Sequence, residues 1–291
     1  MTAEPITHAS GTFTIGGDLT VHRLGFGTMR LPGPGVWGPP RDHDEAVRVL
    51  RRAVELGVDF IDTADSYGPY VAEELVAEAL HPYPEGLVIA TKAGLLRTGP
   101  VRPGEAWPRL GRPEYLRQEV EMSLRRLRLE RIDLFQLHRI DPTVPFDDQL
   151  GELRLLQDEG KIRHVGLSEV TVDELSRAQK IVDVVSVQNR FNLVLRPAED
   201  VLDHATEQGI AFIPFVPLAV GELAAHDGPL REMAQRLGAT PSQLALAWLL
   251  RRSPAILPIP GTSRVEHLEQ NLGAAEIELD DEDYAMLAGL A

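Results

Sequence analysis

The feature that most constrains this chain is a repeated alternation between short apolar runs of strand type and longer stretches with helical spacing. Runs too apolar to be half-exposed are typical of parallel strands that helices cover. Eight such strands are the number that closes a (β/α)8 barrel. The eight candidate strands are residues 24–28, 58–62, 87–91, 132–138, 162–168, 184–189, 210–215 and 255–260.

A doubly wound open sheet is the competing architecture, and the first candidate strand argues against it. Such a sheet normally carries a G-x-G-x-x-G turn after that strand. Here Gly25 and Gly27 are followed by Thr28-Met29-Arg30, without a third glycine in place. The sequence therefore favours an α/β fold of the TIM-barrel type over the open sheet.

The first residues are expected to form a separate β-hairpin. Two β-prone runs, Thr12–Ile15 and Leu19–His22, flank Gly16 and Gly17, a pattern typical of a hairpin with a primed turn. No linker divides the rest, so we expect a single barrel domain over residues 1–291 with a hairpin at about 12–22.

Composition and charge disfavour several classes of protein. The chain has no cysteine, which removes disulfides, thiolate zinc sites and cysteine nucleophiles. It has no H-E-x-x-H motif or clear His/Asp pair at the strand ends, so no metal is expected. The net charge of −15 disfavours nucleic acid and anionic membranes as partners. No apolar run approaches the ~18 residues of a membrane span, and the N-terminus lacks the features of a signal peptide, so a cytoplasmic location is expected.

Polar side chains stand where the predicted strands end, which is the catalytic rim of a barrel. Each has a structural alternative: Asp62 could cap a helix, Lys92 could be a solvated loop residue, and His138 could be a core histidine. A rim without function would require all of these alternatives to apply together. Because four titratable groups share one predicted face, the sequence favours a functional site there. The residues at this rim are Thr28, Asp62, Lys92, His138, Ser168, Gln188, Asn189, Phe215 and Pro260, with Tyr67 five positions after Asp62.

Four of these groups have a joint chemical meaning. An ammonium at Lys92 stabilises the phenolate of a neighbouring Tyr67, so the pKa of the phenol is expected to fall below ~10. Asp62 would keep the lysine charged, and a neutral His138 could donate a hydrogen bond to a carbonyl oxygen. Such a set can protonate a carbonyl oxygen as negative charge develops there. The hydride must then come from a cofactor.

The ordered set of motifs resembles the aldo-keto reductase family from Leu24 to about Ala275, including an N-terminal hairpin that closes the barrel bottom in that family. The motifs are highly specific as a set in this order. They are Gly25-Phe26-Gly27-Thr28-Met29, Asp62-Thr63-Ala64-Asp65-Ser66-Tyr67-Gly68, Thr91-Lys92, Leu137-His138, the run from Gly160 to Ser168, and Ile259-Pro260-Gly261-Thr262.

The resemblance implies an NADPH-dependent enzyme, with NADH also possible, that reduces aldehydes or ketones to alcohols. Its catalytic residues would be Asp62, Tyr67, Lys92 and His138, with Tyr67 as the general acid. Ser168 and Gln188 would hold the carboxamide, and Phe215 would stack on the nicotinamide. The implied cofactor-binding residues are Gly27, Thr28, Met29, Asp62, Ser168, Gln188, Phe215, Pro217, Leu218, Gly261, Thr262, Ser263, Arg264, Gln270 and Asn271.

Several positions depart from the commonest family pattern. Glu169 replaces an asparagine, Phe215 a tyrosine, and Val216 a residue that is often serine. Gly261-Thr262 stand where some branches have Lys-Ser, so Arg264 is the main cation available for an adenosine 2′-phosphate.

The substrate pocket is expected to be built by the loops 29–40 and 93–113. The chain lacks the long C-terminal tail that lines the pocket in several branches, so the expected walls are Trp37, Trp107, Tyr67 and His138. Aromatic walls suit apolar or aryl carbonyl compounds. In the alternative, the two tryptophans only staple their own loops.

Two other functions stay open at this point. One is a cofactor-sensing regulatory subunit on the same fold with slow reductase activity, like the potassium-channel β subunits. The other is a different barrel enzyme, such as a phosphate-sugar isomerase or a metal hydrolase.

Overall fold

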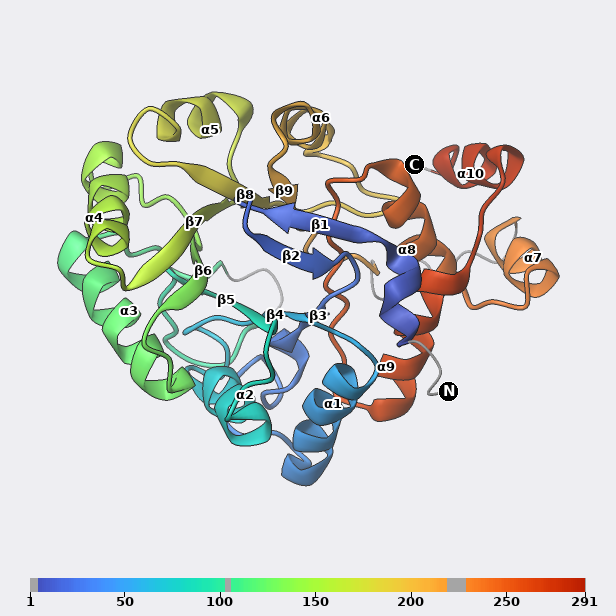
Figure 1. The fold of residues 1–291 in the computed structure, drawn as a ribbon, viewed down its shortest axis with the longest axis horizontal. Helices are drawn as coiled ribbons and strands as arrows, with labels where there is room; N and C mark the ends of the chain where they lie inside the picture. Colours follow the sequence, from blue (N-terminus) through green and yellow to red (C-terminus); the bar gives the residue numbers. More distant parts are fainter. Residues whose placement is uncertain (1–4, 103–105, 219–228, 291) are drawn as a thin grey trace.

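The computed structural model describes residues 5–102, 106–218 and 229–290, and it confirms the predicted barrel. A curled parallel sheet forms the centre, with the strands in chain order from β3 to β9. Its strands are β3 (Phe26–Gly27), β4 (Phe60–Asp62), β5 (Val88–Ala93), β6 (Ile132–Leu137), β7 (Ile162–Ser168), β8 (Val184–Gln188) and β9 (Ala211–Phe212). Figure 1 shows the helices arranged around this sheet.

The predicted eighth strand, 255–260, is an irregular segment instead of a regular strand. It meets β9 through an isolated bridge between Phe212 and Ile256. Leu257 N donates to Phe212 O at 2.8 Å, and Gly25 N donates to Pro258 O at 3.0 Å. The segment therefore still closes the ring, but Pro258 and Pro260 have no N–H and cannot extend a ladder.

The closing seam between β3 and this segment depends on residues without side chains. A Cβ on Gly27 would lie 2.7 Å from the carbonyl oxygen of Ile259, and one on Gly261 would lie 2.5 Å from the carbonyl oxygen of Gly27. Real Cβ atoms do not approach backbone oxygen that closely. Glycine at both positions thus lets the first and last parts of the barrel touch.

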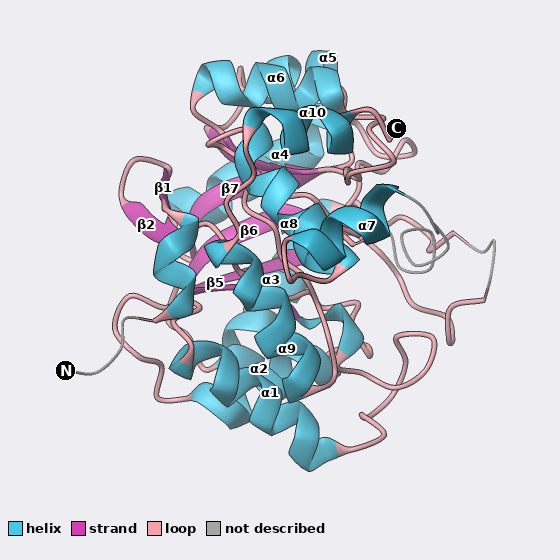
Figure 2. Ribbon diagram, turned by 90° about the vertical axis from the view of Figure 1, so that its right-hand side faces the viewer, coloured by secondary structure: helices cyan, strands magenta, loops and turns pink. Residues whose placement is uncertain are grey.

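The hairpin of β1 (Thr12–Ile15) and β2 (Leu19–His22) covers the end where the strands begin (Figure 2). Gly16 and Gly17 both have positive φ, 60° and 81°, as a primed turn requires. Ile15 and Val21 are fully buried and belong to the same apolar cluster as Phe60, Val88 and Leu134 of the barrel interior. The chemistry must therefore lie at the opposite, carboxyl end.

Two of the helices that surround the sheet begin at capping motifs. Thr171 with Glu174 and Thr240 with Gln243 form capping boxes at the starts of α5 and α8. The helices are α1 (His43–Glu55), α2 (Val71–Leu80), α3 (Pro113–Leu127), α4 (Phe146–Asp158), α5 (Val172–Ala178), α6 (Glu199–Gln208), α7 (Pro229–Arg236), α8 (Pro241–Arg252), α9 (Val265–Leu272) and α10 (Asp281–Ala288), with 3₁₀ turns η1 (Ile6–Ser10), η2 (Thr28–Arg30) and η4 (Gly273–Glu276). Within the described ranges, no helix has the length and apolarity needed to cross a membrane.

Candidate active site

Most of the predicted rim residues line one cleft of about 530 Å3 at the carboxyl ends of the strands; Thr28, Lys92 and Asn189 do not. Asp62, Ser168 and Gln188 are the last residues of β4, β7 and β8, and His138 follows β6 directly. The predicted site residues that line the cleft are Gly27, Met29, Asp62, Tyr67, Trp107, His138, Ser168, Gln188, Phe215, Pro217, Leu218 and Gly261.

A second cleft, of about 890 Å3, adjoins the first and shares Met29 and Arg30 with it. Ser263 and Arg264 line this second cleft. The structure does not place the other predicted residues on either cleft: these are Thr28, Trp37, Lys92, Thr262, Gln270 and Asn271. Trp37 instead faces the guanidinium of Arg97, whose Cζ lies 5.6 Å from the Trp37 ring and 4.0 Å from the Trp107 ring.

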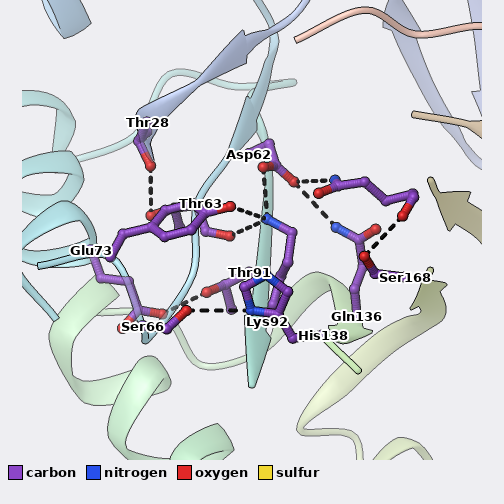
Figure 3. A network of polar contacts seen from close by, with 12 residues as sticks. Thr28, Asp62, Thr63, Ser66, Glu73, Thr91, Lys92, Gln136, His138 and Ser168 are labelled. Atoms are coloured by element: carbon purple, nitrogen blue, oxygen red, sulfur yellow. Dashed lines mark hydrogen bonds and ion pairs between the residues drawn. The ribbon is translucent and has the colours of Figure 1, made fainter. Parts of the chain in front are cut away.

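Asp62 and Lys92 form a fully buried ion pair (Figure 3), of which Asp62 also lines the first cleft. Lys92 Nζ donates to Asp62 Oδ2 at 2.7 Å and to the backbone carbonyl of Thr63 at 2.8 Å. Gln188 and Gln136 donate to the other carboxylate oxygen at 2.8 and 3.2 Å. Because every charge here has a partner, the pair avoids the cost of an unpaired buried ion.

Tyr67 lies within reach of this pair. Lys92 Nζ and Tyr67 Oη are 3.5 Å apart. Burial raises the pKa of Tyr67 above its ordinary value, and the Lys92 ammonium opposes that effect without reversing it. The expected fall in pKa is therefore wrong, because the loss of solvation outweighs the neighbouring charge. Tyr67 keeps its proton at neutral pH, and a protonated phenol is a proton donor.

His138 is buried and stays neutral. Burial and the charge of Lys92 lower the pKa of the imidazole well below its usual range. Its Nδ1 is 3.3 Å from Ser66 Oγ, and its ring meets those of Tyr67 and Trp107 edge-on, with centroids 6.0 and 6.2 Å away. The neutral form that the sequence predicted is thus the one that the surroundings favour.

Buried carboxylates lie close to Tyr67 in the chain: Asp65 is in the same loop, and Glu73 is in the first turn of α2. Glu73 accepts hydrogen bonds from Thr91 Oγ1 at 2.6 Å and from Arg126 Nε at 2.5 Å. Asp65 Oδ2 accepts from Tyr115 at 3.1 Å, but its Oδ1 is buried with no hydrogen-bond partner in the described structure. Burial and the charge of Glu73 raise the pKa of Asp65 well above its ordinary value.

Sequence reasoning missed Arg139, which follows His138 directly and lines the cleft. Its Nη1 donates to Ser168 Oγ at 2.9 Å, and its Cζ lies 5.6 Å from the ring of Phe215. The sequence analysis considered only the residue at the end of each predicted strand, and Arg139 lies one position further on. An arginine directly after a rim histidine is the signal that could have identified it, since that position also lies at the carboxyl end of a barrel strand.

The second cleft has a different character from the first. Arg264 is the N-cap residue of α9, and its guanidinium forms an exposed ion pair with Glu266 at 2.8 Å. Val265 N, in the first turn of that helix, donates to Glu45 Oε1 at 2.9 Å. Two carboxylates therefore already occupy donors that a phosphate would use.

A protonated phenol, a buried ammonium and a neutral imidazole at the carboxyl end of a barrel define a class of oxidoreductases that act on carbonyl compounds. The model of the aldo/keto reductase family matches residues 23–291, nearly the whole chain. The chain belongs to the aldo/keto reductase family, and it is an enzyme that carries out NAD(P)H-dependent carbonyl reduction.

Known proteins similar to this chain include two curated relatives and a solved structure. An uncharacterised oxidoreductase of Schizosaccharomyces pombe is 54% identical, covering 96% of this chain and 89% of that protein. Pyridoxine 4-dehydrogenase of Escherichia coli is 42% identical, covering 97% and 99%. An aldo-keto reductase from Klebsiella pneumoniae, solved in complex with NADPH, is 28% identical with a TM-score of 0.80, covering 96% and 94%.

Proposed function

We propose that this protein is a cytoplasmic NADPH-dependent reductase of aldehydes or ketones in which Tyr67 is the general acid. The observation that carries the proposal is the contact between Lys92 and Tyr67, 3.5 Å, at the floor of a cleft that His138 and Trp107 also line. A phenol that stays protonated beside a fixed ammonium is ready to give up its proton when charge develops on a substrate oxygen.

The two adjoining clefts fit an extended dinucleotide. Gly27 and Gly261 line the first cleft, so the closing seam of the barrel contributes to its wall. Phe215 supplies an aromatic face and Gln188 an amide near the floor, while Ser263 and Arg264 line the second cleft. In this proposal Ser168, Gln188 and Phe215 hold the nicotinamide end, and Arg264 faces the 2′-phosphate. When bound, the cofactor supplies a hydride to the carbonyl carbon.

The protein's own residues would handle the proton. The substrate oxygen accepts hydrogen bonds from Tyr67 Oη and from His138 Nε2, which requires that Ser66 Oγ–H donates to His138 Nδ1. As the carbonyl carbon is reduced, the Tyr67 O–H bond breaks and an O–H bond forms on the product alcohol. Lys92 stabilises the phenolate that is left, and Asp62 holds Lys92 in place.

The walls indicate the type of substrate. Tyr67, Trp107 and Leu95 give the cleft an apolar and aromatic side. We therefore expect aryl or apolar aldehydes and ketones to be the better substrates.

A panel of carbonyl compounds, followed by the absorbance of NADPH and in parallel of NADH, tests the proposal. We expect reactive aryl aldehydes to turn over, with NADPH preferred. Absence of turnover with every carbonyl, in a protein that binds NADPH, would overturn the assignment as a reductase and favour a cofactor-sensing role.

A further inference from the structure

Arg139 is a cation that lines the cleft and takes no part in the proposed proton transfer. Its guanidinium donates to Ser168 Oγ at 2.9 Å and to the carbonyl oxygen of His138 at 2.5 Å. The Cζ atom lies 5.6 Å from the ring of Phe215. Arg139 therefore sits between the aromatic face and the serine hydroxyl at the nicotinamide end of the cleft.

The charge of Arg139 has no close counter-ion. Lys92 is neutralised by Asp62 at 2.7 Å, and Arg126, Arg252 and many other arginines pair with carboxylates. In the described parts of the chain, no carboxylate lies within the 4.0 Å of an ion pair from Arg139. Burial lowers its pKa and Glu169 opposes this, but an arginine stays charged. Glu169, Arg109 and Arg190 also line this cleft, but the Arg139 guanidinium is the charge that donates to Ser168 and lies beside Phe215 at its nicotinamide end.

The reacting ring must come close to this charge. Hydride transfer requires the donor carbon to lie about 3–3.5 Å from the carbonyl carbon, whose oxygen contacts Tyr67 and His138. Arg139 is the next residue after His138 and lines the same cleft as Tyr67, Ser168 and Phe215. A ring held by Ser168 and Phe215 is therefore a near neighbour of the Arg139 guanidinium.

On this basis, and resting on the proposed function, we infer that Arg139 sets the redox preference of the cofactor site. The nicotinamide ring is neutral in NADPH and carries a positive charge in NADP⁺. A fixed cation beside the ring repels the oxidised form and leaves the reduced ring unaffected. Arg139 then favours binding of NADPH and release of NADP⁺, so the site fills with the reduced cofactor and frees the oxidised one, while the overall equilibrium of the reaction is unchanged. It acts as a specificity-determining residue, with no part in the proton transfer.

The test is the ratio of the dissociation constants for NADP⁺ and NADPH, measured by calorimetry without any carbonyl substrate. In Arg139→Met, which keeps an apolar stem and loses the charge, we expect the ratio to fall by roughly fivefold to a thousandfold, the range for two unit charges about 4 Å apart between bulk water and a protein surface. Arg139→Lys keeps the charge and should keep most of the ratio.

Two control variants distinguish an effect of the Arg139 charge from a structural effect on the cofactor site. Ser168→Ala removes the partner of Arg139 but leaves the cation, so it should weaken both cofactor forms and leave their ratio unchanged. Arg264→Gln, in the second cleft, should do the same. If wild-type protein binds both forms and the NADP⁺/NADPH ratio of dissociation constants is unchanged or higher in Arg139→Met, the inference about Arg139 is wrong and the proposed function stands. If wild-type protein binds neither form, the proposed function itself is wrong.

Discussion

The two ends of the proposed cofactor and substrate site are built differently. At the proton-donor end, the side chains of Lys92 and Asp62 are 0% and 2% exposed, and protein groups satisfy both. At the far end, Arg264 and Glu266 are 60% and 64% exposed, and among the residues that the structure describes they form an ion pair only with each other. The first region is organised before any ligand arrives, whereas the second must give up an ion pair to bind a phosphate. Mutational effects should follow this difference.

The largest effect should come from Tyr67→Phe, which removes only the transferable proton. We expect carbonyl reduction to fall about 10²- to 10⁴-fold, the usual contribution of a positioned general acid. Binding of NADPH, measured by fluorescence, should stay near wild type. Tyr70→Phe is a matched control, since that ring is 40% exposed and lies outside both clefts. Wild-type turnover in Tyr67→Phe would remove Tyr67 from the mechanism.

The ion pair should respond unequally to loss of its two members. Lys92→Met leaves a buried carboxylate without its cation and costs about 3–5 kcal/mol of stability, together with nearly all turnover. Asp62→Asn should be milder, because Lys92 still donates to the carbonyl of Thr63 at 2.8 Å. Denaturant unfolding and turnover, measured on both variants, would contradict this order if Asp62→Asn were the more damaging.

At the exposed end the effects should be smaller and should depend on salt. Arg264→Ala should weaken NADPH binding about tenfold and leave NADH nearly unchanged, since a charge-assisted contact contributes about 1.5–3 kcal/mol before the ion pair is broken. Glu266→Gln frees the guanidinium and should tighten NADPH binding about twofold, the scale of an exposed pair. Both changes should shrink as salt rises. Equal weakening of both cofactors in Arg264→Ala would assign Arg264 a role in loop support.

The smallest effect concerns Asp65, the buried carboxylate in the loop that carries Tyr67. The folded pKa of Asp65 is raised above its unfolded value near ~3.9, so its favourable contribution is present below about pH 4 and is lost as pH rises toward the folded value. Asp65→Asn should match wild type at pH 4 and melt roughly 2–6 °C higher at pH 8. Asp183→Asn, an exposed aspartate, is the control. A difference between Asp65→Asn and wild type that does not change with pH would mean that Asp65 is ionised in the folded protein.

The sequence predicted the barrel because its signals are local. Apolar runs and the Gly16-Gly17 turn each need only neighbouring residues. Asp62, Tyr67, Lys92 and His138 were predicted to meet because strand ends share one rim. What it could not supply depends on three-dimensional packing. The rise in the pKa of Tyr67 needs its burial, and the pairing of Arg264 with Glu266 needs side-chain rotamers. The approach of Arg139 to Phe215 joins two distant loops.

The glycine-lined seam has a consequence for how the chain reaches this fold. Arg23, beside the seam, bonds the carbonyl oxygen of Ile256 across 233 residues, and Gly25 bonds that of Pro258. The ribosome synthesises the chain from its N-terminus. The 255–260 segment, which is the second neighbour of β3, is therefore made only after almost every other strand. Contacts so distant in sequence also form slowly. Until then, one edge of β3 stays unpaired, and the two-residue length of this strand limits how much backbone another chain could pair with there.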